Sequence, residues 1–149
     1  MEYFAYSQRE FVYKYVVMLT DTDQFEHMSF ANYLKLMFLA ADALFSGCFN
    51  ADFLSQRRMK LVHSRMQFKR QSAPGDNILV KVNASGVNRH RFSLLYTFVI
   101  EGTAELVGLG RQTFDLLNVR KNIPEEIPDE MKALLAPIAV NEEHLLYEY

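Results

Sequence analysis

The sequence predicts a single α+β domain in which a curved antiparallel sheet wraps around one long central helix. Three observations predict this fold class. A strand-like segment comes first, a helix that is apolar on nearly every face follows, and several alternating segments joined by short turns come last. Short connections favour antiparallel neighbours, and a helix without a polar face must be covered on most sides. A sheet curved around such a helix meets both conditions.

Length and composition fit one globular domain formed by residues 1–149. Apolar residues make up 50% of the chain, with twelve Phe and eight Tyr, which a disordered chain would not carry. The net charge of −2 lacks the basic excess that is typical of nucleic-acid binders. The single cysteine, Cys48, excludes an internal disulfide and a Cys-rich zinc site, and it fits a reducing compartment as an inert packing thiol.

Targeting signals are not evident in the sequence. Residues 1–10 lack the apolar core of a signal peptide. The most apolar stretch, residues 33–45, is interrupted by Lys35 and Asp42 and is too short to span a bilayer. We therefore expect a cytoplasmic protein without a membrane span.

The first half of the chain predicts a strand, a loop and a helix. Residues 11–19 are rich in Phe, Tyr and Val, which favours a strand, and the polar residues 20–24 favour a loop. Ser29 suits a helix N-cap, and Gly47 suits the position after the helix end. Between them, apolar residues recur at helical spacing. These residues are Phe30, Tyr33, Leu34, Met37, Phe38, Ala41 and Phe45.

The second half predicts an antiparallel meander. Apolar and polar residues alternate with the period of a half-exposed strand, and Pro and Gly mark the turn at residues 73–76. A short helical stretch, residues 129–135, lies among prolines near the end. The predicted strands cover residues 62–69, 78–85, 91–100 and 104–117.

Residues 21–34, which read Asp-Thr-Asp-Gln-Phe-Glu-His-Met-Ser-Phe-Ala-Asn-Tyr-Leu, resemble hotdog-fold acyl-CoA thioesterases of the 4-hydroxybenzoyl-CoA thioesterase type. That family shows a strand, Asp-Thr-Asp, and a helix that opens with an Asn-Tyr-Leu-like run at this spacing. Residues 30–35 are also similar to the thioesterases of enediyne polyketide pathways. The resemblance spans residues 11–128. Further matches are residues 66–70, the turn at 74–76, Gly108, Gly110, Gln112, Thr113, Ile123 and Pro124.

The resemblance implies a hotdog fold and the hydrolysis of an acyl-CoA or acyl-carrier-protein thioester, without a cofactor. It also implies a homodimer or a tetramer of dimers, with the acyl group between two subunits. By position, the catalytic carboxylate, acting as base or nucleophile, falls on Asp23. A carboxylate just before a helix suits this chemistry, because free N–H groups and the positive dipole end lie beside the reacting carbonyl.

The chain departs from its relatives at several positions. Phe25 and Glu26 stand where small residues, often Gly, precede the helix. Phe38 stands where many relatives place a Glu, and Ala41 where the enediyne type places an Arg. These departures keep a second reading open, namely a non-catalytic hotdog protein that binds acyl thioesters. A hotdog hydratase or dehydratase is disfavoured, since neither characteristic motif is present.

The predicted catalytic residues are Asp23, His27 and Asn32. His27 could orient water or act as a base, or it could be structural. Asn32 could hold water or Asp23, or it could bond to backbone in the first helical turn. The predicted substrate-binding residues are Gln24, Met28, Ser29, Phe30, Ala31, Tyr33, Arg65 and Arg70.

Other polar residues have competing interpretations. Asp21 and Asp23 could simply cap turns, or they could pair as metal ligands. Because no further ligands follow at suitable spacing, we expect no metal site. A set of basic residues could contact the phosphates of CoA or of a carrier protein, or form an ordinary solvated strand face. These residues are Arg65, Lys69, Arg70, Arg89, His90 and Arg91.

Overall fold

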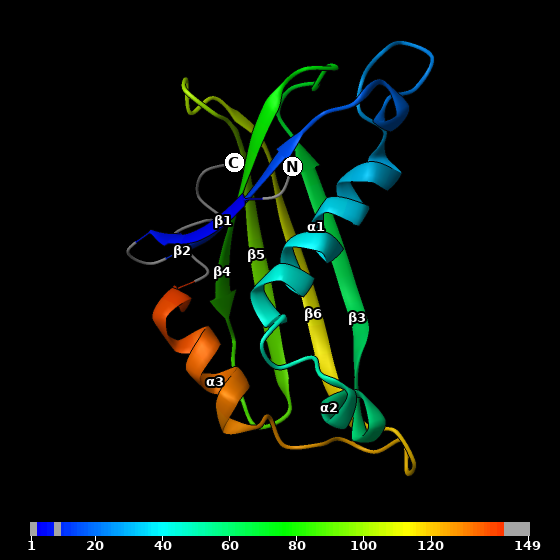
Figure 1. Cartoon of the computed structure of the whole chain (residues 1–149), viewed down its shortest axis with the longest axis vertical. Helices are drawn as coiled ribbons and strands as arrows, with labels where there is room; N and C mark the ends of the chain where they lie inside the picture. Colours follow the sequence, from blue (N-terminus) through cyan, green and yellow to red (C-terminus); the bar gives the residue numbers. More distant parts are fainter. Residues whose placement is uncertain (1–2, 8–9, 142–149) are drawn as a thin grey trace.

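The computed structural model describes residues 3–7 and 10–141, which form an antiparallel sheet with the long helix α1 lying across one face (Figure 1). The described sheet has six strands in the order β1-β2-β4-β5-β6-β3. The strands are β1 (Tyr3–Ser7), β2 (Glu10–Val16), β3 (Arg57–Phe68), β4 (Asn77–Ser85), β5 (Arg91–Ile100) and β6 (Leu106–Asn118). The helices are α1 (Phe30–Phe45), α2 (Ala51–Gln56) and α3 (Asp129–Leu135), with short 3₁₀ turns at Leu19–Asp21 and Ala136–Ile138.

Helix α1 begins after the N-cap Ser29, as predicted, and ends just before Ser46 and Gly47. Its sheet-facing residues, such as Met37 and Ala40, are completely buried. A narrow stripe that includes Phe38 and Asp42 remains exposed. The helix is therefore covered on most of its faces, and its uncovered margin is partly apolar.

Two glycines of β6 leave room for methionine side chains in the core. A Cβ atom on Gly108 would lie 2.6 Å from Met66 Cε, and one on Gly110 would lie 2.7 Å from Met37 Sδ. Both methionine side chains therefore occupy space that a side chain on β6 would otherwise fill. Further along the same face, Phe92 and Phe114 stack at 5.4 Å and close the core near the end of α1.

Strand β3 forms one edge of the sheet. It pairs with β6 on one side, and no strand of the described chain pairs with its other side. Most of its twelve residues are exposed, and a bulge between Leu61 and His63 inserts Val62 into the pairing. Phe68 at its upper end packs edge-on against Phe30 of α1. The open edge and the apolar margin of α1 thus form one continuous surface.

The structure confirms the predicted architecture and corrects its details. Residues 91–100 and 129–135 form a strand and a helix with the predicted bounds. The first predicted strand ends earlier, at Val16, and the last is shifted, because Ala104 closes a turn with a φ of 58°. The sequence did not predict β1 or α2, and β3 begins five residues before the predicted strand. No helix in the described part of the chain is long and apolar enough to cross a membrane.

Candidate active site

The loop between β2 and α1 places two aspartates beside the start of α1. Thr22 and Met28 form an antiparallel bridge, so the chain between them closes into a tight turn. Inside the turn, Asp23 N donates to His27 O at 2.9 Å, and Glu26 N donates to Asp23 O at 3.0 Å. The loop therefore holds Asp23 by its own backbone.

Asp21 lies on the inner side of this loop and is only 5% exposed. Its Oδ2 accepts hydrogen bonds from Tyr15 OH at 2.6 Å and from Met18 N at 2.9 Å. Burial, together with the hydrogen bond to Asp21, raises the pKa of Tyr15 to about 12. Asp21 therefore anchors the loop to β2.

Asp23 lies on the outer side of the loop and is exposed. Its Oδ1 accepts from Phe25 N at 2.8 Å and, more weakly, from His27 N at 3.4 Å. Among the residues that the structure describes, none bonds to its Oδ2. One oxygen thus shapes the turn, and the other is open to water or to a substrate.

The amino end of α1 presents two free backbone donors. Met28 N donates to Ser72 O at 2.9 Å, and Ser29 N donates to Asp21 O at 3.2 Å. Within residues 3–7 and 10–141, the N–H groups of Phe30 and Ala31 have no partner, and both residues are exposed. The N–H donors expected from Met28 to Ala31 are therefore corrected to these two, because Ser72 O and Asp21 O already accept from the other two.

Asn32 ties the loop to the helix. Its Nδ2 donates to Asp21 O at 2.6 Å and to Ser29 Oγ at 3.0 Å. These are local bonds around the first helical turn, one of the two arrangements that the sequence allowed. No bond joins Asn32 to Asp23 in the described structure.

The remaining loop residues surround Asp23. Gln24 is exposed beside it, and His27 is half-buried below it. Glu26 has a φ of 59°, in the left-handed region that favours glycine. A glycine at this position would adopt this conformation without strain.

Tyr33 belongs to the core, which corrects its assignment as a substrate-binding residue. It is 1% exposed, and its OH bonds to Ser72 Oγ at 2.7 Å. Its ring packs edge-on against Phe68 and Phe98 at 5.0 and 5.5 Å. Burial raises the pKa of Tyr33.

The structure does not bring Arg65 and Arg70 together at the helix start. Arg65 pairs in register with Arg111, on the sheet face that points away from α1. Arg70 donates to Glu105 at 2.8 Å and lies 3.8 Å from Asp76, so carboxylates already surround its guanidinium. Carboxylates therefore already balance the charge of Arg70, and Arg65 points away from α1.

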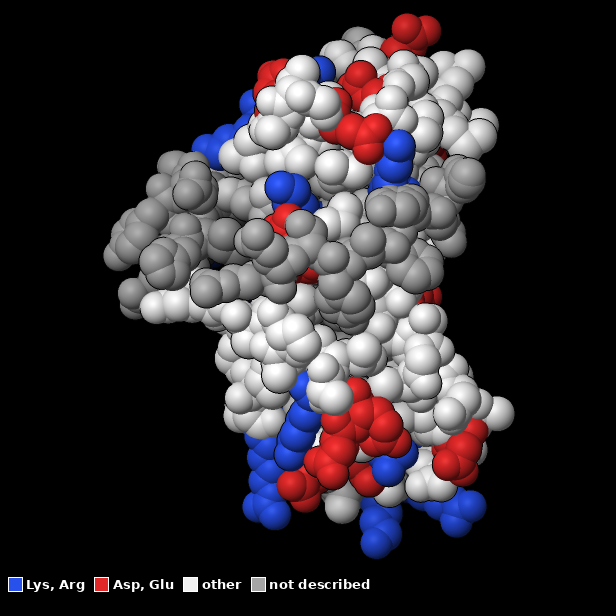
Figure 2. All heavy atoms as spheres, turned by 60° about the vertical axis from the view of Figure 1, so that its left-hand side comes forward, with Lys and Arg blue, Asp and Glu red and all other residues white. Residues whose placement is uncertain are grey.

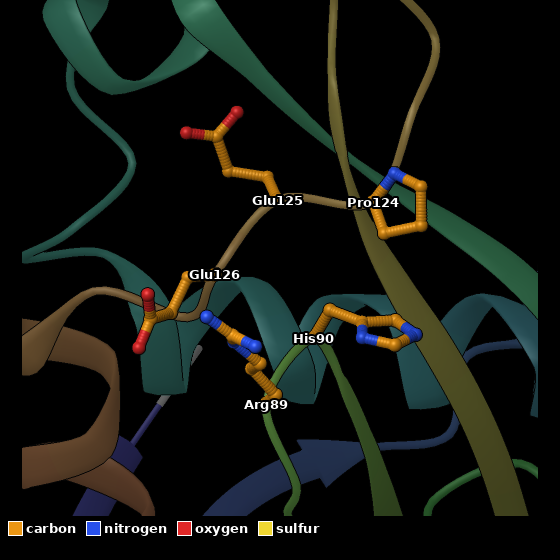
Figure 3. Close-up of a pocket in the computed structure, with 5 residues that line it drawn as sticks. All are labelled: Arg89, His90, Pro124, Glu125 and Glu126. Atoms are coloured by element: carbon orange, nitrogen blue, oxygen red, sulfur yellow. The ribbon is translucent and has the colours of Figure 1, made fainter.

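Three other predicted basic residues, Arg89, His90 and Arg91, lie at the opposite end of the sheet, whereas Lys69 adjoins Arg70. Figure 2 shows charged side chains of both signs gathered at that lower end. A pocket of about 380 Å³ there is lined by Arg89, His90, Pro124, Glu125 and Glu126 (Figure 3). Two carboxylates in the lining disfavour an anionic phosphate, and Arg91 is paired with Asp115. The described residues include no cluster of three or more metal-ligating His, Cys, Asp or Glu side chains.

A family model described as the thioesterase-like superfamily matches residues 17–135. The chain belongs to this superfamily. A search of curated proteins finds no significant match. Among solved structures, a 1,4-dihydroxy-2-naphthoyl-CoA thioesterase from Synechocystis is 21% identical, with a TM-score of 0.78, covering 85% of this chain and 95% of that one. The dynemicin thioesterase is 20% identical, with a TM-score of 0.81 and coverages of 89% and 99%.

A third structure similar to this chain is that of a Staphylococcus aureus protein solved in complex with CoA. It is 16% identical, with a TM-score of 0.79, covering 90% of this chain and 86% of that chain. The superfamily match and these structures confirm the predicted hotdog fold and the predicted resemblance to thioesterases.

Several polar residues near the helix escaped the sequence interpretation. Ser72 orders both Met28 and Tyr33, but it lies 39 positions from Tyr33 and carries no local signal. Tyr96 OH donates to Gln112 Oε1 at 2.9 Å inside the core. The sequence did carry a signal for Gln112, since it is a polar residue at a position of β6 that faces α1, as Gly110 does.

Proposed function

We propose that this member of the superfamily hydrolyses an acyl-CoA or acyl-carrier-protein thioester. One observation carries the proposal. The open oxygen of Asp23 and the unpartnered N–H groups of Phe30 and Ala31 belong to the same short loop-to-helix junction. Thioester hydrolysis requires both elements, a carboxylate and donors aimed at the developing oxyanion.

In the proposed reaction, the substrate carbonyl oxygen accepts hydrogen bonds from the helix N–H groups. Asp23 removes a proton from an attacking water, or it attacks the carbonyl carbon itself and is then released by water. The C–S bond breaks, the thiolate takes up a proton, and the free acid leaves. The positive end of the α1 dipole stabilises the negative charge that forms on oxygen. His27, half-buried in the same loop, is the proposed helper of this step.

A CoA thioester is the substrate class that the similar structures favour. The Synechocystis enzyme is described as a thioesterase for an aromatic acyl-CoA, and the Staphylococcus protein was solved with CoA. Both support an acyl group linked to the thiol of CoA as the substrate of this chain. An acyl group linked to the thiol of a carrier protein is the second candidate.

The test compares thiol release from acyl-CoA and acyl-carrier-protein substrates by wild type and Asp23→Asn. We expect the variant to lose at least about 100-fold in kcat/KM. Asp52→Asn is the matched control, since Asp52 is an exposed aspartate in the first turn of α2 and should be dispensable. Full activity of Asp23→Asn would eliminate Asp23 as the catalytic carboxylate.

The alternative function is binding of an acyl thioester without turnover. Phe38, 44% exposed on α1, favours it, because related helices carry a carboxylate at this position. A protein with this function would bind acyl-CoA in calorimetry, release no thiol, and bind equally well as Asp23→Asn.

We also propose that the protein is a homodimer formed through β3. A twelve-residue open edge exposes unpaired N–H and C=O groups, and exposed apolar side chains such as Phe38, Val62 and Phe68 adjoin it. A two-fold pairing of two such edges would satisfy both features and place the active sites between subunits.

Light scattering after size exclusion tests the dimer. Val62→Glu should convert dimer to monomer and reduce hydrolysis, because a charge would be buried in the pairing. Val87→Glu is the control, since this valine is equally exposed in the β4–β5 loop. A wild-type protein that is monomeric at micromolar concentration would contradict the proposal.

A further inference from the structure

A short chain of polar groups crosses the otherwise apolar interface between α1 and the sheet. Tyr96 and Gln112 lie on neighbouring strands and are 1% and 0% exposed. Tyr96 OH donates to Gln112 Oε1 at 2.9 Å, and Gln112 Nε2 donates to Ser64 Oγ at 3.4 Å. The chain therefore runs from the core to the open edge strand β3.

This chain leaves hydrogen-bonding capacity unused. A glutamine amide has two N–H donors, and in the described structure Gln112 makes one long donor bond, to Ser64. The hydroxyl oxygens of Tyr96 and Ser64 can each accept a further hydrogen bond. The second N–H of Gln112 and the exposed hydroxyl of Ser64 can therefore bond to a polar ligand.

The charge near this chain decides which polar ligand fits. Burial raises the pKa of Tyr96 well above its usual value, and the carboxylate of Asp42 on α1 raises it further. Desolvation raises the pKa of Asp42 as well, and its side chain lies on the exposed stripe of α1. A neutral hydroxyl group on a ligand can donate to the hydroxyl oxygen of Tyr96 or Ser64 and accept from Gln112 Nε2. A carboxylate on the ligand would instead be repelled by the carboxylate of Asp42.

A path to this cluster begins at the start of α1. Between Phe68 and Ser64, the seam beside β6 is filled by Met66 and Met37, which contact Gly108 and Gly110 as described above. Methionine side chains are flexible and adapt readily to a new neighbour. Met66 is half-buried on the edge strand, so an acyl chain can displace it without disturbing the sheet.

We propose that this seam holds the far end of the acyl group, and that Gln112, Tyr96 and Ser64 select a neutral hydroxyl group on it. The inference rests on the proposed thioesterase function. From Phe68 to Ser64 the strand advances four residues, or roughly 13 Å. This length suits a medium-chain acyl group that carries its hydroxyl at the end remote from the thioester.

The experiment compares three acyl-CoAs of equal length: decanoyl-CoA, its ω-hydroxy derivative and its ω-carboxy derivative. Wild type should prefer the hydroxylated substrate over decanoyl-CoA by at least about fivefold in kcat/KM, and should use the carboxylated one least. Gln112→Leu should bring the ratio of kcat/KM for the hydroxylated substrate to that for decanoyl-CoA to about one. Ser64→Ala should also reduce the preference for the hydroxylated substrate. Because Ser64 lies exposed on the edge strand, this variant should fold normally.

Gln67→Leu is the matched control, because Gln67 lies on β3 but faces away from α1. It should leave the preference unchanged. A wild-type ratio near one, or an unchanged ratio in both Gln112→Leu and Ser64→Ala, would overturn the inference. If neither these acyl-CoAs nor the corresponding acyl-carrier-protein thioesters are hydrolysed, the thioesterase proposal fails instead.

In that case, calorimetric binding of ω-hydroxydecanoic and decanoic acids still tests the seam. Tighter binding of the hydroxylated acid, lost in Gln112→Leu, would support it. Equal affinity for the two acids, or no binding of either, would overturn it.

Discussion

The inner and outer sides of the loop before α1 carry two aspartates with opposite environments. Asp21 is buried, and its carboxylate accepts from Tyr15 and from the backbone of Met18. Asp23, two residues later, is exposed and uses one oxygen within the turn. The difference teaches that the same residue type serves twice in one motif. The inner aspartate anchors the loop, and the outer one keeps one oxygen without a partner in the described structure.

The largest expected difference between the inner and outer sides of the loop is in how much each aspartate contributes to the free energy of unfolding. Asp21→Ala should lower the free energy of unfolding by about 2–3 kcal/mol, because the Tyr15 hydroxyl and the Met18 N–H lose a buried acceptor. Asp23→Ala should lower it by less than about 1 kcal/mol, since Asp23 is exposed. Urea unfolding of the two variants measures both values. Equal losses would show that the two sides are not energetically distinct.

The second effect concerns Asn32, which joins the two sides. Asn32→Ala should reduce the free energy of unfolding by about 1–2 kcal/mol, since Asp21 O and Ser29 Oγ lose their donor. Asn32→Asp has the same shape without N–H donors and should be at least as damaging. Thermal unfolding compares the two. A stable Asn32→Asp protein would mean that the donated bonds contribute little.

A third, smaller effect is pH-dependent. Tyr15→Phe should cost about 1 kcal/mol at neutral pH through the lost bond to Asp21. The pKa of Tyr15 is raised from 10.0 to about 12 in the folded protein, so folding favours its protonated form. That contribution is fully present below pH 10 and is lost as the pH rises toward 12.

Denaturant unfolding across the alkaline range measures this dependence. Wild type should lose stability faster than Tyr15→Phe as the pH rises from 10 to 12. Parallel curves for the two proteins would contradict the assignment of the shifted hydroxyl to Tyr15.

The smallest effect lies on the outer side, at Glu26. Its φ of 59° is unfavourable for a residue with a Cβ atom. Glu26→Gly should relieve the strain and raise the free energy of unfolding by less than about 1 kcal/mol, because the more flexible unfolded chain offsets part of the gain. Glu26→Ala keeps the strain and is the control. A glycine variant less stable than the alanine variant would refute this account.

Local sequence signals were sufficient for the parts of the fold that depend on neighbouring residues. Ser29 and the helical spacing after it predicted α1, and alternation predicted β4. Residues 57–61 at the start of β3 gave too weak a signal, because only Met59 and Leu61 are apolar among them. The six-residue helix α2 is too short for a periodic pattern.

The candidate site was predictable only to the level of its loop. The sequence pointed to the junction at Asp23, but it could not distinguish the roles of Asp21 and Asp23, which depend on where Tyr15 points. Nor could it tell which helix N–H groups remain open. That depends on Ser72, which reaches Met28 from more than forty residues away.

The placement of β3 also has a consequence for how the chain acquires its structure. Its partner strand β6 comes late in the chain, and His63 pairs with Thr113, fifty positions further on. During synthesis, β3 must therefore wait until β4, β5 and β6 have emerged and paired. Its exposed Leu61, Val62 and Phe68 are uncovered throughout that interval. The strand that completes the sheet last is thus the segment that a chaperone would need to shield during translation.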